Sequence, residues 1–224
     1  MKRLVKLKFI AAAAALLVIL SGCQAVSAAA NTWDVGTDPA KLQTESGIFQ
    51  YPGIPWGSSA ADIEKAVGHP LTVGGRQRDA LPDEPGLYLL TDNFFIWDEK
   101  YASVILTMGE EPKGINELTF TFTPEMELSN GKTQKLDLGG LYQDLVKSFT
   151  ESLGEPTDTS SINNPQFSVV AWRAFLTQEN GRYISNSIAL RVFGPEEEPS
   201  KVSIELSNTL MAPEFSPEQI KKRT

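Results

Sequence analysis

Apolar residues recur at helical spacing in two segments of the chain, and both segments end in the same way. The first predicted helix begins after Ser59, a favourable N-cap residue, and ends at Gly68 before Pro70. The second ends at Gly154 before Pro156. The apolar positions expected to face the core are Ile63, Ala66 and Val67 in the first helix, and Leu138, Leu141, Tyr142, Leu145, Val146, Phe149 and Leu153 in the second.

Alternation of apolar and polar residues predicts strands after each helix, because neighbouring side chains of a strand lie on opposite faces of its sheet. Each half of the chain offers a strand with a tryptophan, a loosely alternating strand and a strictly alternating strand. The segments are 94–97, 102–108 and 118–123 in the first half, and 169–172, 183–193 and 202–207 in the second. Clusters of glycine, proline and asparagine separate them, as is typical of turns.

The order of these elements indicates an α+β fold with two helix-on-antiparallel-sheet repeats, in which helix, strand, strand and strand occur twice. We expect the first repeat at 47–127, the second at 128–210 and a C-terminal tail at 211–224. The pattern leaves open whether the repeats share one sheet or form two domains. Since each helix covers one sheet face, the other face is expected to meet solvent. The residues predicted there are Thr119, Thr121, Thr123, Arg191, Ser203 and Glu205.

The first 22 residues have the layout of a secretory signal peptide. Four basic residues among the first eight precede an uncharged apolar run at 9–20, which is shorter than the roughly 20 residues needed to span a bilayer. The sequence Leu20-Ser21-Gly22-Cys23 that follows resembles the lipobox of bacterial lipoproteins. An ordinary signal-peptidase site within 25–30 is the alternative, and cleavage there would remove Cys23.

The lipobox resemblance implies that 1–22 is a lipoprotein signal peptide and that Cys23 becomes the first residue, modified with two or three acyl chains such as palmitate. Two or more chains give stable attachment to a membrane. The resemblance implies a location on the outer face of the bacterial cytoplasmic membrane, or in the outer membrane if the host is Gram-negative. Residues 23–46 are rich in small and polar residues and are expected to form a flexible tether.

The charge balance excludes some partners. The 224 residues carry 20 basic and 28 acidic side chains, a net charge of −8. Removal of 1–22 takes away four basic and no acidic residues, so the mature chain would hold 16 basic residues against 28 acidic ones, a net charge of −12. This balance argues against binding nucleic acid and against lying on an anionic membrane surface. No cysteine follows Cys23, so a disulfide or a CxxC site is not expected.

The residues Gly57 to Pro70 follow the pattern G-S-S-x-x-[DE]-[IV]-x-x-x-[LV]-G-x-P. This pattern resembles the helical opening of small secreted or lipid-anchored bacterial domains of the β-lactamase-inhibitor-protein-like and BamE-like kind. The resemblance implies a helical layer over an antiparallel sheet, in tandem in the inhibitor protein, and binding of other proteins through sheet faces and loops. It assigns no binding residue to this chain.

Candidate catalytic groups are sparse. His69 is the only histidine, which leaves no second ligand for a usual zinc site, and Ser58 and Ser59 are better explained as helix caps. The acidic pairs 98–99 and 110–111 are interpreted as solvated turns rather than as an acid–base pair. The run 196–198 lacks the spaced ligands of a calcium loop. We therefore expect no cofactor, no metal site and no enzymatic activity.

The tryptophans allow two interpretations. Trp97 and Trp172 are predicted to pack in the core, and the alternative is that they anchor a partner. If Val170, Trp172 and Ala174 face a helix, the other side of the same strand forms an apolar strip with one arginine, which is typical of a protein contact. The residues of that strip are Phe167, Val169, Arg173 and Phe175.

The sequence thus favours a non-catalytic binding or scaffolding module for another envelope macromolecule. The first alternative is an inhibitor that inserts a loop, such as 76–86 or 180–183, into an extracellular enzyme. The second is a hydrolase of unrecognised type. A protein partner in the envelope is expected under the favoured interpretation, in addition to the membrane.

Overall fold

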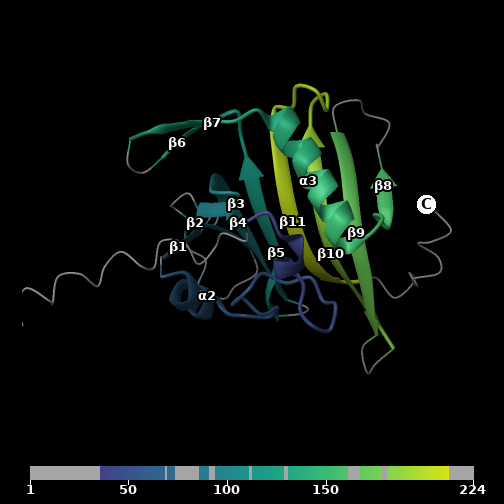
Figure 1. The fold of residues 1–224 in the computed structure, drawn as a ribbon. Helices are drawn as coiled ribbons and strands as arrows, with labels where there is room; N and C mark the ends of the chain where they lie inside the picture. Colours follow the sequence, from purple (N-terminus) through teal and green to yellow (C-terminus); the bar gives the residue numbers. More distant parts are fainter. Residues whose placement is uncertain are drawn as a thin grey trace, which may run out of the picture. The chain divides into compact units, whose positions relative to one another are not determined.

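One antiparallel sheet of nine strands dominates the computed structural model (Figure 1). Its order is β1-β2-β4-β5-β11-β10-β9-β8, and β3 pairs with β4 beside this path. The strands are β1 (Leu71–Val73), β2 (Gly86–Leu90), β3 (Phe94–Trp97), β4 (Lys100–Glu110), β5 (Lys113–Phe122), β8 (Asp158–Ser160), β9 (Phe167–Thr177), β10 (Tyr183–Phe193) and β11 (Lys201–Leu210). A separate hairpin consists of β6 (Glu125–Glu127) and β7 (Thr133–Lys135).

The structure describes residues 36–68, 70–73, 86–90, 94–110, 113–128, 131–160, 167–177 and 181–211. The predicted signal peptide, Cys23 and His69 lie outside these ranges, as do all of the tail except Met211. Among the described residues, no helix has both the length and the apolar character needed to cross a membrane.

The two halves of the chain meet in the middle of the sheet. Antiparallel pairing joins β5 to β11 from Phe122 opposite Val202 to Glu117 opposite Ser207. On either side, the strands follow in mirrored order, with β4 and then β2 outside β5, and β10 and then β9 outside β11. The α+β class is confirmed, and the two predicted repeat segments contribute to one shared sheet.

The two helices form where the capping signals predict them. In α2 (Ala60–Val67), the Ser59 hydroxyl accepts a hydrogen bond from the Asp62 N–H, and Gly68 has a left-handed conformation with a φ of 74°. The prediction that Ala66 faces the core is wrong, because Ala60 completes the buried side with Ile63 and Val67. These three residues are separated by three and four positions and therefore share one side of the helix.

The longer helix, α3 (Leu138–Leu153), begins at an N-cap that the sequence pattern did not reveal. The Asp137 carboxylate accepts a hydrogen bond from the Gly140 N–H, and the helix ends before Gly154 as predicted. Its predicted apolar face is confirmed: Leu145 and Phe149 are fully buried, and Val146 and Leu153 pack at the margin of the core.

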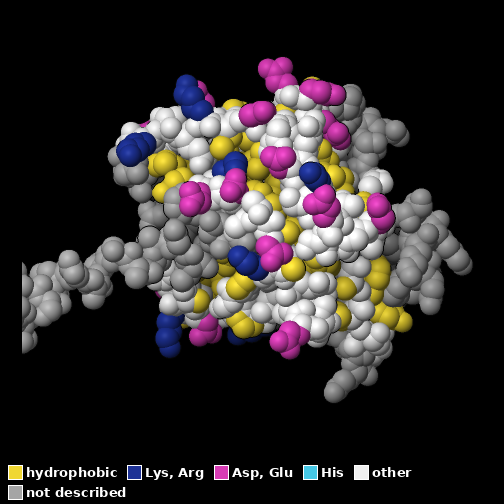
Figure 2. Space-filling model, in the orientation of Figure 1, with side chains coloured by type: hydrophobic (Ala, Val, Ile, Leu, Met, Phe, Trp, Pro, Cys, Tyr) yellow, Lys and Arg dark blue, Asp and Glu magenta, His cyan; other side chains and the backbone are white. Residues whose placement is uncertain are grey.

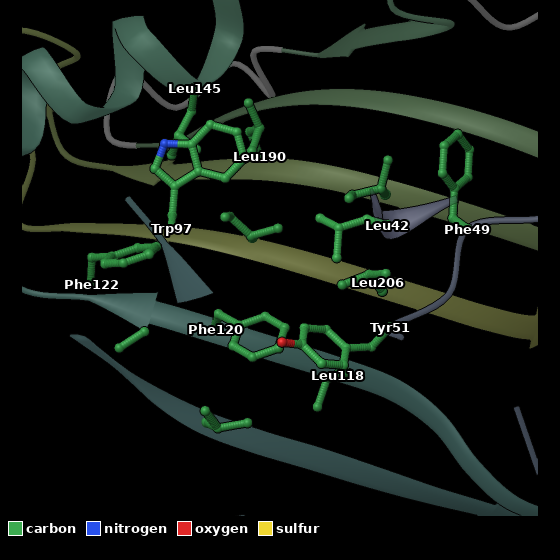
Figure 3. Packing of buried hydrophobic residues seen from close by; sticks show 14 of the residues in the cluster. Leu42, Phe49, Tyr51, Trp97, Leu118, Phe120, Phe122, Leu145, Leu190 and Leu206 are labelled. Atoms are coloured by element: carbon green, nitrogen blue, oxygen red, sulfur yellow. The ribbon is translucent and has the colours of Figure 1, made fainter. Parts of the chain in front are cut away.

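Both tryptophans discussed above pack in the core, as predicted, but on the same helix. The rings of Trp97 and Trp172 each lie 5.4 Å from the Phe149 ring of α3. The indole of Trp172 also donates a hydrogen bond to the Gly154 carbonyl at 2.7 Å, which satisfies its N–H inside the core. Figure 3 shows Trp97 beside Leu145 over the sheet. Phe149 therefore links strands from both halves of the chain.

The segment before α2 packs on the same sheet face as the helices. It includes a 3-10 helix, η1 (Pro39–Leu42), and places Leu42, Phe49, Tyr51 and Ile54 in the core cluster. Tyr51 stacks at an angle on Phe120 of β5, with 5.4 Å between the ring centroids (Figure 3). The prediction of a flexible tether over 23–46 is therefore wrong at its C-terminal end. Single apolar residues such as Leu42 bury themselves without producing a periodic pattern.

A buried asparagine fixes this segment to the sheet. The side chain of Asn186, on β10, accepts a hydrogen bond from the Phe49 N–H at 2.6 Å and donates one to the Phe49 carbonyl at 2.9 Å. Asn186 is fully buried and also donates to the Asn208 side chain at 3.3 Å. The Phe49 carbonyl accepts a further bond from the Trp56 indole. Phe49 also forms an isolated antiparallel bridge with Gln43, but the bonds of that bridge are made by the flanking residues, and the amide of Asn186 satisfies the N–H and C=O of Phe49 itself.

We expect Asn186→Ala to lower the free energy of unfolding by roughly 2–4 kcal/mol, because it leaves the buried N–H and C=O of Phe49 short of partners. Chemical denaturation monitored by tryptophan fluorescence measures the loss. Asn116→Ala, at a half-buried position of β5, is the matched control and should change stability by less than about 0.5 kcal/mol. Equal effects of the two substitutions would contradict the role assigned to Asn186.

Candidate functional site on the open sheet face

The open face is the side of the sheet opposite α2, α3 and the segment 39–56. The core-facing side of β4, β5, β10 and β11 is formed by apolar residues except for Asn186 and Asn208, so alternation places most of the polar and small residues on the open face. Of the six residues predicted to meet solvent, five lie on these strands with side chains on the open face. They are Thr119, Thr121, Arg191, Ser203 and Glu205. The sixth, Thr123, follows β5, and its hydroxyl donates to the Glu125 carbonyl.

Two of the residues predicted to meet solvent on the open face are buried. Thr121 and Ser203 lie opposite each other on β5 and β11, and they are only 9% and 3% exposed. Their hydroxyl oxygens are 3.2 Å apart and share a hydrogen bond. Ser187 and Ser207 make a similar contact at 2.8 Å between β10 and β11. Cross-strand hydroxyl pairs therefore satisfy the polar groups that neighbouring side chains cover.

A hollow of about 360 Å³ lies over β9, β10 and β11 on the open face, and we call it the central groove. It is lined by Glu117, Val169, Ala171, Arg173, Ser185, Ser187, Ala189, Arg191, Glu205, Ser207, Thr209, Leu210 and Met211. Small side chains produce the hollow: Ala171 lies opposite Ala189, and Ser187 lies opposite Ser207. Longer charged side chains stand around this floor.

An ion pair borders the groove between β10 and β11. An Nη of Arg191 donates to a carboxylate oxygen of Glu205 at 2.6 Å. The Glu205 side chain is only 12% exposed, whereas that of Arg191 is 37% exposed. The Nε–H of Arg191 is buried and has no hydrogen-bond partner among the described residues. Arg191 therefore keeps one donor unused while its terminal nitrogen neutralises Glu205.

Burial raises the pKa of Glu205, because the charged form loses its water. The positive charge of Arg191 acts in the opposite direction, and the negative charge of Glu117 raises the pKa further. Glu117 itself accepts a hydrogen bond from the Thr119 hydroxyl at 3.3 Å. The groove thus places two carboxylates close enough to interact, with an arginine beside one of them.

Arg173 borders the groove on β9 and is tied to the neighbouring strand. One of its terminal nitrogens lies 3.5 Å from a carboxylate oxygen of Asp158 on β8. Both side chains are about three-quarters buried, with exposed fractions of 28% and 24%. The pair holds the guanidinium against the sheet edge rather than letting it extend into solvent.

Aromatic and cationic side chains meet at the end of the open face nearest the β10–β11 turn. The rings of Phe167 and Phe193 lie 4.9 Å apart. The Nζ of Lys201 lies 4.0 Å from the Phe193 ring centroid, and the Arg191 guanidinium lies 6.0 Å from that of Phe167. The predicted strip of β9 is confirmed, since Trp172 and Val170 belong to the core side while the alternate residues 167, 169, 173 and 175 lie on the open face.

The other candidate residues do not join this site. Ser58 and Ser59 lie at the start of α2, where Ser59 is the cap. Asp98 and Glu99 form the two-residue turn between β3 and β4, and Glu196 to Glu198 lie exposed in the turn before β11. Among the described residues, no three His, Cys, Asp or Glu side chains converge as metal ligands would. Of the two loops considered for an inhibitor, 76–86 lies outside the described ranges except for Gly86, whereas 180–183 is described from Gly181 onward.

Two acidic residues of this site, Glu117 and Asp158, were not among the residues predicted from the sequence. A signal existed for Glu117, because it precedes the alternating run 118–123 in the same phase as Thr119 and Thr121. None existed for Asp158, whose role depends on the pairing of a three-residue strand with β9.

Several charged and polar groups of the groove are paired with neighbouring side chains. Its arginines are held by carboxylates, and the hydroxyls of Ser187 and Ser207 on its floor share a hydrogen bond. Such a surface offers hydrogen bonds and charges of both signs to a polar partner. Comparison with known proteins gives no match to a family model, to a curated protein or to a solved structure.

We expect the pKa of Glu205 to lie above its ordinary value of 4.5, to fall in Glu117→Gln and to rise in Arg191→Gln. NMR titration of the side-chain carboxyl carbon measures all three. Glu151→Gln, on the exposed side of α3, is the control and should leave this pKa unchanged. A rise in Glu117→Gln would contradict the assigned coupling.

The same shift has a consequence for stability. Because folding raises the pKa of Glu205, the folded protein holds this proton more tightly than the unfolded chain. The contribution of this proton to the free energy of unfolding is complete below pH 4.5, and it is lost as the pH rises through the pKa of Glu205 in the folded state. Glu205→Gln should therefore reduce the fall in unfolding free energy across this pH range.

Proposed function

We propose that this protein is a membrane-anchored extracytoplasmic lipoprotein that acts as a non-catalytic binding or scaffolding module for another envelope macromolecule. The observation that carries the proposal is the central groove, a hollow bordered by arginines and carboxylates on the sheet face opposite both helices. A bound protein would supply the polar groups that complement it.

The composition of the open face supports a protein as the partner. Arginine and aromatic residues are enriched in the centres of protein interfaces, and this face combines Arg173 and Arg191 with Phe167, Phe175 and Phe193. The helix side is different in character. Figure 2 views it and shows acidic side chains spread over the surface, outnumbering Lys and Arg. We interpret the helix side as a solvated surface that keeps the domain soluble and apart from anionic lipid.

The mirrored strand order supports a further part of the proposal, that the two halves are repeats of one unit. In each half a helix precedes a run of antiparallel strands, and the last strand of each lies at the centre of the sheet. The halves differ where β2 and β3 pair with successive parts of β4, whereas β9 alone pairs with the whole of β10. An interrupted strand in one copy would account for this difference.

The open face is tested by photo-crosslinking in the native envelope. A benzophenone amino acid replacing Thr209, an exposed residue that lines the groove, should form a defined adduct with one partner. The same probe replacing Glu151 on α3 is the control and should form none. Arg173→Glu, combined with the Thr209 probe, should reduce the adduct several-fold by reversing a charge at the groove. Adducts from position 151 alone would contradict the proposed use of the open face.

The anchor is tested through Cys23. We expect Cys23→Ala to move the protein from the membrane fraction to the soluble fraction, because it removes the acceptor for lipid. Immunoblotting of fractionated cells measures the change, and Ser46→Ala is a control that leaves the lipobox intact. Mass spectrometry of the natural protein should show Cys23 as the first residue with a diacylglyceryl adduct. A first residue beyond position 23 would refute the anchor.

A further inference from the structure

The strand at one edge of the sheet is only partly paired. β8 contacts β9 at three positions, with Asp158, Thr159 and Ser160 opposite Ala171, Val170 and Val169. β9 continues to Thr177, and Figure 1 shows its second half running on past β8. Residues 172–177 therefore form an edge along which no described strand pairs on the side away from β10. We call this stretch the free edge.

The direction of the backbone groups along the free edge follows from two hydrogen bonds. The Ala171 carbonyl accepts a bond from the Thr157 N–H, so Ala171 directs its backbone away from β10. On β10, the Tyr183 carbonyl accepts a bond from the Met211 N–H and so faces the β11 side. Backbone groups alternate along an antiparallel strand, so Arg173, Phe175 and Thr177 also direct their N–H and C=O groups outward. None of these groups has a backbone partner among the described residues.

Among the described residues, the free edge shows none of the features that usually block strand pairing. Natural edges are protected by proline, lysine, bulges or a covering segment. Residues 172–177 read Trp-Arg-Ala-Phe-Leu-Thr, and β9 pairs with β10 through this stretch without a bulge. The single charge, on Arg173, is held by Asp158 on β8. The ion pair neutralises the one residue that could otherwise repel a neighbouring strand.

We propose that the free edge pairs with the free edge of a second copy of this chain, antiparallel and centred on Phe175. In this register Phe175 exchanges two backbone hydrogen bonds with Phe175 of the second copy. Arg173 exchanges two with Thr177 of the second copy, and the twofold symmetry repeats this pair. Every outward backbone group of the free edge then has a partner, and the two sheets become one continuous sheet.

The side chains match in the same register. On the open face, Phe175 lies beside its symmetry mate as a cross-strand aromatic pair, and Arg173 faces Thr177. On the core side, Ala174 faces Leu176, so a small side chain meets a larger one. No like charges oppose each other. This self-complementarity favours a second copy over an unrelated strand, because an isologous contact needs only one surface to match itself.

Net charge gives the proposed dimer a distinctive salt dependence. The net charge is −8 for the 224 residues and −12 for the proposed mature chain, so two copies repel each other at long range in either form. The bonds at the free edge are backbone bonds and apolar contacts, which salt screens little. Raising the ionic strength should therefore strengthen the dimer, the opposite of what an interface formed by ion pairs would show.

The register is tested by disulfide trapping in the full chain with Cys23→Ser, so that no native thiol contributes. Phe175→Cys places two thiols on the symmetry axis, where paired Cα atoms lie about 5.5 Å apart, within disulfide reach. Mild oxidation should give a covalent dimer on a non-reducing gel. Glu151→Cys, at an exposed position of α3, is the control and should give little covalent dimer. Equal yields from the two positions would overturn the register.

Sedimentation velocity over a concentration series tests the contact without a crosslink. The full chain with Cys23→Ser should show a monomer–dimer equilibrium that shifts toward dimer as salt is added. Phe175→Lys should weaken the dimer by at least about tenfold because like charges meet at the axis, whereas Phe175→Tyr should preserve it. A monomer at every concentration, or a dimer unaffected by Phe175→Lys, would overturn the proposal. So would trapping of Phe175→Cys to a different protein in native membranes in place of a second copy.

Discussion

The antiparallel pairing of β5 with β11 determines which surfaces of the described chain are buried. It joins the two halves at their last strands, so both halves contribute to one sheet with a common core side. Both helices and the segment 39–56 then pack on that side, where Phe149 contacts tryptophans from each half. Nine strands are thus covered by two helices and one irregular segment. The other side of the sheet must be compatible with water and with its own hydrogen bonds.

This one-sided burial explains the character of the open face. A strand that buries one side carries small or polar residues on its other side. On the open face these include Ala171, Ala189, Ser187 and Ser207, whose side chains are too small to fill the space above the sheet and leave the central groove. The longer charged side chains around these residues are partly shielded from solvent although they lie outside the hydrophobic core. Glu205 shows the result, since its carboxylate is largely buried, needs Arg191 as a partner and has a raised pKa. The Glu205 carboxylate has thus already lost much of its hydration in the free protein. A partner that covers this face would therefore remove little further water from it.

Local patterns in the sequence predicted the elements better than their assembly. β3 and β10 have the predicted bounds, and the caps at Ser59, Gly68 and Gly154 form as their residue types indicate. Each of these features depends on neighbours in the chain. The contact of Phe49 with Asn186 spans 137 positions, and the pairing that brings Glu117 near Glu205 depends on the register of β5 with β11. Periodicity carries no information on such partners, which is why the order of the shared sheet and the folded end of the tether were not foreseen.

One strand connects the two parts of the molecule that the proposed function requires. On its core side, β10 carries Asn186, which fixes the backbone of Phe49 and with it the segment that leads back toward the N-terminus. On its open side, the residues that flank Asn186, Ser185 and Ser187, line the central groove. The segment around Phe49 is therefore attached to a strand that forms part of the groove floor. Under the proposed anchoring at Cys23, β10 would lie between the membrane attachment and the proposed binding surface, and this strand is paired along its length on both sides.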